Sequence, residues 1–475
     1  LGTPPPVAPT PGFLTNWTEV FGESPNVSPP PHFWAFAVAA GILGDLMLRV
    51  GLATVAGSLF VLSLVAVVAL QRRSQLSRLD AVGLSLATVL AMFLALRTSY
   101  WVAGPAFLAS ASLTFLVANG RLSGGTRPWI RSAIATALGG VNSVRWTART
   151  LERLGRNSGQ SAGTFVRSLL LVVMLSAVLV GLLASGDAVT SAVLAALQIE
   201  SILSHGFGFT VSLVGAVAVG FVALLTKGAE HHRFDVPTIR FALEANTAVW
   251  TMASILGAWS ALQISVVLGA ADQILETEGL TVAQYARQGF FELVTVAAIV
   301  LAALRFAGRL SGLAFTPSGR SFRIGARLIG AELLVLIGAT FVRLSFYINE
   351  FGLTMLRLSV AWFLGWLAFF SLVVVARSVG SAWADRWSHS VAVLSLSVAV
   401  LSFAAINPEA VVVRSTLSQA EPDLDYLGRL SGDGVDALQG LPDRQVRESL
   451  VNDICTANGT EGFGPFGFNA GSPSC

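Results

Sequence analysis

The chain alternates long apolar stretches with short polar connections. Ten stretches are almost free of acidic and basic residues: 52–70, 81–96, 100–118, 168–186, 207–225, 241–269, 289–304, 328–345, 353–375 and 388–405. Most of them approach the roughly 20 residues that a helix needs to cross about 30 Å of hydrocarbon. The pattern therefore predicts an all-α integral membrane protein, a polytopic bundle of about 10–11 transmembrane helices with an extracytoplasmic C-terminal tail.

An eleventh stretch, residues 33–49, is apolar but contains Asp45 and Arg49, which are four residues apart and can pair on one helix face. If it spans, there are eleven helices and the N-terminus is cytoplasmic; if it lies in the interface, there are ten. We favour eleven. The expected organisation is a Pro-rich mobile segment (1–32), the helical bundle (33–405) and an acidic tail (406–475).

Arginine residues alternate between the connections. They gather in 72–78, 119–167, 227–240, 305–327 and 377–386, whereas 97–99, 187–206, 270–288 and 346–352 are short or acidic. The positive-inside rule places the arginine-rich connections, with the large basic loop 119–167, in the cytoplasm and the tail outside. We expect the inner (plasma) membrane of a bacterium. Only 12% of the residues are charged, and topology explains the basic excess without a nucleic-acid partner.

The only two cysteines, Cys455 and Cys475, lie in the tail. An oxidising exterior would allow them to form a disulfide; the alternative is two free thiols in a disordered end. The glycine-rich residues 462–471 are typical of disorder. Asn407 and Pro408 are predicted to end the last spanning helix, because proline restricts the residue before it to non-helical conformations.

Polar residues at membrane depth are costly and are therefore candidates for a functional site. Glu332 lies inside a predicted span. Glu350 and Arg357 are seven residues apart, so they either share one helix face or face each other across a turn around Gly352, where they could pair. Clamps between helices are one interpretation, and a site for an ion, a ligand or a lipid headgroup, or a catalytic site, are the others. The candidate polar cluster comprises Glu244, Asn246, Tyr285, Arg287, Glu292, Arg343, Tyr347, Glu350 and Arg357.

Signals for catalysis are weak. None of the five histidines has metal-ligand spacing with a cysteine or carboxylate partner, and no phosphate-binding glycine loop, nucleophile elbow or zinc-protease motif occurs. The sequence predicts no catalytic residue, no metal and no cofactor.

Five segments carry a resemblance to a known family: LLASGDAV (182–189), EGLTVAQYARQGFFEL (278–293), YINEFGLTMLRL (347–358), INPEAVVVRSTL (406–417) and DLDYLGRLSGDGVDAL (423–438). The chain resembles bacterial multi-pass membrane proteins with the domain of unknown function 4173, related to that numbered 4153, over roughly residues 35–440. The sequence departs from the family pattern at Gln288, at Glu409 and at Ile264-Ser265. The resemblance implies the architecture and assigns no activity.

Three functions are compatible with these features. The first is a non-enzymatic scaffold or assembly/signalling partner in a membrane complex of the bacterial envelope, with membrane lipids and membrane proteins as partners. The second is a transporter or ion/lipid carrier that uses Glu244, Glu292, Arg343 and Arg357. The third is an enzyme acting on a lipid-linked substrate at the outer face.

Overall fold

The computed structural model describes residues 31–118, 242–265, 319–378, 382–419 and 421–458, together with Leu122, Asn469 and single helical residues within 205–217 and 296–304. Every regular element in these ranges is a helix, so the all-α prediction is confirmed there. In chain order the elements are α2 (Pro31–Val50), α3 (Val55–Arg72), α4 (Arg78–Leu96), α5 (Tyr100–Ala118), α10 (Ala242–Ser265), α14 (Arg320–Phe351), α15 (Met355–Ser378), α16 (Ala382–Ala405), α17 (Pro408–Leu417), α18 (Leu424–Leu427), η4 (Gly432–Gly440) and α19 (Arg444–Asn458).

The described helices include six that are long and apolar enough to cross a membrane: α2, α3, α4, α5, α14 and α15. A seventh is added if α16 and α17, which meet at a bend of 50°, are counted as one span. The chain is therefore a multi-pass membrane protein. The predicted span 168–186 and most of 207–225 and 289–304 lie outside the described residues, so the total of 10–11 stays a prediction.

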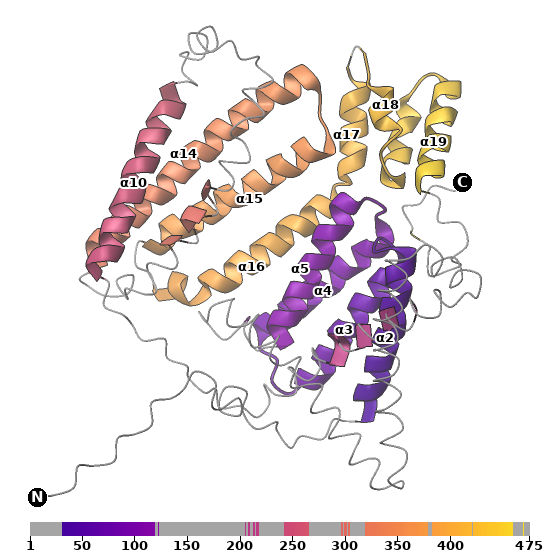
Figure 1. Cartoon of the computed structure of the whole chain (residues 1–475), viewed down its shortest axis with the longest axis horizontal. Coiled ribbons are helices and arrows are strands. Elements are labelled where there is room, and N and C mark those ends of the chain that lie inside the picture. Colours follow the sequence, from indigo (N-terminus) through magenta and orange to yellow (C-terminus); the bar gives the residue numbers. More distant parts are fainter. Residues whose placement is uncertain are drawn as a thin grey trace, which may run out of the picture.

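Two groups of helices form the membrane part (Figure 1). In the first, α3, α4, α5 and α16 share a core that includes Val68, Leu90, Leu94 and Leu113. In the second, α10, α14 and α15 pack around residues such as Leu333. Helix α16 contacts both α5 and α15 and so joins the two groups. Large apolar side chains on the outer faces remain exposed, as expected where the surrounding medium is hydrocarbon.

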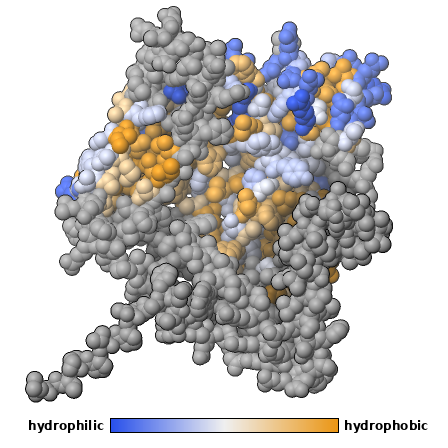
Figure 2. Space-filling model, viewed as in Figure 1, coloured by the Kyte–Doolittle hydropathy of each residue, from blue (hydrophilic) through white to orange (hydrophobic). Residues whose placement is uncertain are grey.

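The segment 408–458, with α17, α18, η4 and α19, folds as a small helical module that we call the cap. Its core side chains include Leu427 and Leu438, and they pack on Val102 of α5, Met355 of α15 and Phe403 of α16. The cap thus rests on both groups of helices at one end of the bundle, at the upper right of Figure 1. In Figure 2 hydrophilic surface is concentrated over the cap, and apolar surface lies over the helices below it.

Connections predicted to share one side of the membrane lie together. The α4–α5 connection (97–99), the α14–α15 connection (352–354) and the break between α16 and α17 all meet the cap, through bonds such as that from the Met355 N–H to the Tyr426 hydroxyl (2.8 Å). The connections that meet the cap are the ones that alternate along the chain with the arginine-rich connections. The side of the membrane that the cap faces stays a prediction.

Two arginines of the membrane helices bind within the fold. Arg49 on α2 pairs with Asp45 (3.2 Å), as their spacing predicted, and the same carboxylate lies 2.7 Å from Nδ1 of His205. Arg72, at the end of α3, is buried and donates to the Val117 carbonyl oxygen in the last turn of α5. A helix carbonyl end is favourable for a cation, so Arg72 also has a structural role beside its contribution to topology.

Candidate functional site

A cluster of buried and half-buried polar groups joins the cap to the membrane helices. We call it the polar node and define it as Arg97, Thr98, Ser99, Asn407, Glu409, Ser431 and Asp433.

Asp433 of η4 lies at the N-terminus of α5, where its carboxylate accepts hydrogen bonds from the main-chain N–H groups of Thr98 (3.0 Å) and Ser99 (3.1 Å). The first N–H groups of a helix have no partner within the helix, so an acidic side chain there is stabilising. A cap residue thus supplies acceptors to a membrane helix 334 positions away along the chain.

Asn407 makes the break between α16 and α17. It adopts the left-handed conformation with φ of 53°, and Pro408 follows it at the start of α17. Its side-chain oxygen accepts from the Ala410 N–H (3.4 Å), and its amide nitrogen donates to the Asp433 carbonyl oxygen (2.9 Å). Asparagine suits this position because it tolerates positive φ and can bind locally. Asn407 and Pro408 therefore end α16 and hold η4 against the start of α17.

Glu409 is almost completely buried in the node, with 2% of its surface exposed. Its carboxylate accepts from the Ser431 N–H (2.9 Å) and the Ser431 hydroxyl (2.7 Å). Burial raises the pKa of Glu409, and burial likewise raises the pKa of Asp433, against which the bonds from Thr98 and Ser99 act. The two carboxyls also repel each other as charges, which adds to the raised pKa of Glu409.

Arg97 and Asn469 complete the hydrogen bonding around the node. The Arg97 guanidinium donates to the carbonyl oxygens of Ala404 (3.1 Å) and Ala405 (3.4 Å), which end α16. Asn469 is 2% exposed, and its amide nitrogen lies 2.8 Å from the Ala53 oxygen, 3.0 Å from the Leu94 oxygen and 2.9 Å from the Arg97 oxygen. The expectation of disorder at this position is therefore wrong, because Asn469 is buried against the first group of helices.

An open groove of about 440 Å³ lies beside the node, between the cap and the first turns of α5 and α15. We call it the outer groove. Its floor includes Glu409, and Tyr426, whose pKa is raised by burial, stands on the cap side. The remaining lining residues are Ser99, Tyr100, Trp101, Thr354, Met355, Leu356, Arg429, Leu430 and Ser431.

Of the predicted polar cluster, Arg357 and Tyr347 come together. The Arg357 guanidinium lies 4.2 Å from the centre of the Tyr347 ring, in a cation–π contact. It also donates to the carbonyl oxygens of Phe351 (2.7 Å) and Gly352. The expected pair with Glu350 is not formed, because Arg357 turns to these carbonyls while Glu350 is exposed. Arg357 therefore closes the end of α14.

The other members of the cluster are scattered or not described. Arg343 lies on α14, and its Nε atom is buried without a hydrogen bond, although other interactions engage the residue. The Oδ1 atom of Asn246 on α10 is likewise buried without a partner. Tyr285, Arg287, Glu292 and the Glu244 side chain lie outside the described residues. The structure thus supports an Arg357–Tyr347 contact, and the larger cluster stays a prediction.

The predicted cysteine pair is only partly described. Cys455 lies on α19 and is not a free thiol, whereas Cys475 falls outside the described residues. Pairing of the two therefore stays a prediction.

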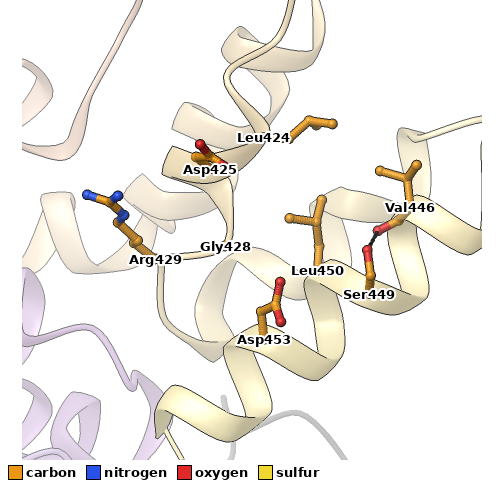
Figure 3. Close-up of a pocket in the computed structure, with 8 residues that line it drawn as sticks. All are labelled: Leu424, Asp425, Gly428, Arg429, Val446, Ser449, Leu450 and Asp453. Atoms are coloured by element: carbon orange, nitrogen blue, oxygen red, sulfur yellow. Dashed lines mark hydrogen bonds between the residues drawn. The ribbon is translucent and has the colours of Figure 1, made fainter.

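A second groove, of about 450 Å³, lies within the cap between α18 and α19 (Figure 3). We call it the cap groove. Leu424, Val446 and Leu450 contribute apolar surface, and Asp425 and Asp453 are exposed acids along it. Arg429 also lines it, so the cap groove offers apolar, acidic and basic side chains, and it includes no residue of the polar node.

Sequence reasoning missed the residues that hold the node together. Arg97, Thr98 and Ser99 form a connection of three residues without a conspicuous motif, and Asp433 is one of many acids in the tail. The segment DLDYLGRLSGDGVDAL contains Asp433 and was the available signal, but it carried no indication of burial. Within the described residues, no group of three histidine, cysteine or acidic side chains is placed to hold a metal ion.

Comparison with known proteins gives one result. The sequence model of the family described as Domain of unknown function (DUF4153) matches residues 59–441, about four fifths of the chain. The sequence resemblance named family 4173 and gave family 4153 as its relative. The family that matches is 4153. No curated protein and no solved structure matches the chain.

Proposed function

Because the chain belongs to the DUF4153 family, whose description assigns no function, we propose from the structure itself that it is a non-enzymatic scaffold of a bacterial envelope membrane. The helical bundle anchors the protein, and the cap, outside the cytoplasm, holds other proteins of a membrane complex. The single observation that carries this proposal is the attachment of the cap to both groups of membrane helices.

The attachment has the properties of a rigid support. Val102, Met355 and Phe403 come from three membrane helices and enter the apolar core of the cap. The bonds from Asp433 to Thr98 and Ser99 add fixed polar contacts in a buried region. Apolar burial contributes about 25 cal/mol per Å², and a buried hydrogen bond about 1 kcal/mol. A module held in this way keeps its orientation when it is loaded by a partner.

The free surface of the cap suits contact with another protein. Seven acidic residues are exposed on it: Glu421, Asp423, Asp425, Asp436, Asp443, Glu448 and Asp453. Arg444 is held by Glu448 at 2.6 Å, so part of the opposing positive charge is already neutralised. The cap groove adds apolar side chains in the middle of this acidic surface (Figure 3). Electrostatic complementarity would favour a partner with a basic, amphipathic segment.

Site-directed photo-crosslinking in the native membrane tests the proposal. A photoreactive residue at Ser449, which is exposed in the cap groove, should capture one defined protein in stoichiometric yield. The same residue at lipid-facing Leu108 serves as the control and should not capture that protein. Purification in mild detergent as a monomer that moves a solute across liposomes, with no crosslink at Ser449, would overturn the proposal.

One observation favours a carrier as the second candidate. Glu332 lies inside α14, and its Oε2 atom is buried without a hydrogen bond. It faces α10 at Gly257, where a Cβ atom would lie 3.0 Å from Oε1, so the small residue makes room for the carboxyl. An intramembrane acid is costly and often functional. Under this alternative, Glu332→Gln abolishes flux in liposomes; under the scaffold proposal it changes only stability.

A further inference from the structure

The outer groove lies where the membrane surface is expected. The apolar helices α5 and α15 begin there, and the hydrophilic cap lies directly above them (Figure 2). The rings of Tyr100 and Trp101, 69% and 44% exposed, stand at the first turn of α5. Tyrosine and tryptophan are favoured at the level of lipid headgroups. The groove therefore opens at headgroup depth.

Hydrogen-bond donors without acceptors line the groove. The Ser99 side chain is 1% exposed, and its hydroxyl makes no hydrogen bond within normal limits, although it is near enough to Glu409 to lower the pKa of that carboxyl. The Ser99 N–H donates to the Asp433 carboxylate. The N–H groups of Tyr100 and Trp101, which follow it, have no acceptor among the described residues.

The opposite wall is built in the same way. The first N–H of α15, from Met355, donates to the Tyr426 hydroxyl at 2.8 Å. The next, from Leu356, has no acceptor in the described part of the chain. Two helix N-termini thus direct free donors and the positive ends of their dipoles toward one space, which is favourable for an anion.

A cation stands at the rim. Arg429 is exposed and lines the outer groove. Arg429 also lines the cap groove, and Figure 3 shows its guanidinium extending away from α19. Glu409 is 2% exposed, one of its carboxylate oxygens accepts from Ser431, and burial raises the pKa of the carboxyl. The groove therefore combines an accessible guanidinium with a buried, hydrogen-bonded carboxyl group.

Apolar surface continues from the groove down the membrane helices. Leu108 on α5 follows Trp101 by seven residues and is 65% exposed, and Phe363 on α15 follows Leu356 by seven and is 37% exposed. A spacing of seven returns to the same helix face. Helix α16 contacts both α5 and α15 and lies between them. Acyl chains could lie over these two faces while a headgroup remains in the groove.

We propose that the outer groove binds the phosphate headgroup of a membrane phospholipid, with Arg429, the Ser99 hydroxyl and the free first-turn N–H groups of α5 and α15 as its donors. This site does not depend on the scaffold proposal, because lipid binding needs only the outer groove, although Arg429 lines both grooves.

Native mass spectrometry of the protein from nanodiscs tests this inference, with dioleoyl phosphatidylglycerol as the probe lipid. Wild type should retain one lipid molecule. Arg429→Gln should weaken binding by about tenfold to a hundredfold, since it removes a charge-assisted bond to phosphate. Arg444→Gln is the matched control, because Arg444 is also an exposed cap arginine but pairs with Glu448; it should bind like wild type. Ser99→Ala should weaken binding by a smaller factor.

The remaining arms separate the lipid from free phosphate. Inorganic phosphate at about 10 mM should leave the lipid bound, because acyl contacts contribute to lipid affinity. Equal retention by wild type and Arg429→Gln would overturn the proposal. So would Arg429-dependent binding of inorganic phosphate without lipid, which would assign the groove to a soluble anion. Melting curves of each variant exclude loss of fold as the cause.

Discussion

Replacement of Asp433 tests whether the cap is fixed to the bundle through the polar node. Asp433→Ala removes the carboxylate that binds the Thr98 and Ser99 N–H groups at 3.0 and 3.1 Å. Asp433 is 4% exposed, so water has little access to replace it. The N–H groups of the two residues that precede α5 then lose their acceptor, and the cap loses its polar connection to the start of that helix.

The magnitude follows from the two orphaned donors. A buried donor left without a partner costs about 1–3 kcal/mol, and loss of an N-cap acceptor costs about 0.5–2 kcal/mol. Because the Thr98 N–H is only partly buried, we expect a total of about 2–4 kcal/mol. Asp433→Asn retains one acceptor oxygen and should cost about half as much.

Hydrogen–deuterium exchange of the protein in detergent measures this effect locally. Since 1.4 kcal/mol corresponds to a factor of ten, exchange in peptides from residues 97–108 and 424–441 should accelerate by about 30-fold to 700-fold in Asp433→Ala. Helices of the second group, such as α10, should exchange as in wild type, because sub-global opening is confined to the affected unit.

Asp436→Ala is the matched control, since Asp436 belongs to the same helix η4 and is exposed. It should change exchange by less than about threefold, because surface substitutions cost within about 0.5 kcal/mol. If Asp433→Ala and Asp436→Ala exchange alike, Asp433 does not fix the cap, and the reasoning from the polar node is refuted.

Four further predictions follow from individual contacts. Gly352→Ala should destabilise the protein by about 1–3 kcal/mol, since Gly352 has φ of +75° and a Cβ would lie 2.5 Å from the Gln419 amide; Gly338→Ala, with nothing within 4 Å, is the neutral control in melting experiments. Asn469→Ala should lower stability by about 1–3 kcal/mol through three lost carbonyl contacts, and a result equal to that of exposed Asn452→Ala would contradict its burial. The raised pKa of Asp433 means that the folded state binds the proton more tightly than the unfolded chain. Its stabilising contribution is therefore complete below the unfolded pKa of about 3.9 and is lost as pH rises through the folded pKa; the stability of wild type relative to Asp433→Asn should fall as the pH rises above about 4, and a flat difference would refute this. Finally, a membrane-impermeant maleimide should label Cys455 and Cys475 on intact cells only after reduction, while Arg145→Cys stays unlabelled; the reverse pattern would place the cap in the cytoplasm.

The helices that support the candidate site could be predicted from the sequence, but the site itself could not. Stretches such as 52–70, 81–96 and 100–118 correspond to α3, α4 and α5. In hydrocarbon the N–H and C=O groups of an apolar segment must form hydrogen bonds within the protein, and a helix forms them all within the segment itself. The break at Asn407-Pro408 was also readable, since proline restricts its neighbours locally. By contrast, the pair expected between Glu350 and Arg357 did not form, because main-chain carbonyls at the end of α14 compete for the guanidinium.

The sequence by itself determined that this protein lies in a membrane, that it is all-α, and that arginine-rich connections alternate with arginine-poor ones. Each of these properties depends on the composition of segments of about 20 residues. Only the tertiary structure decided that acids of a polar tail are buried. Asp433 and Glu409 meet the α4–α5 connection more than 300 positions away along the chain, and such a contact depends on how helices pack. The same packing placed Ser99 and Arg429 around one groove, which no local pattern of residues could have indicated.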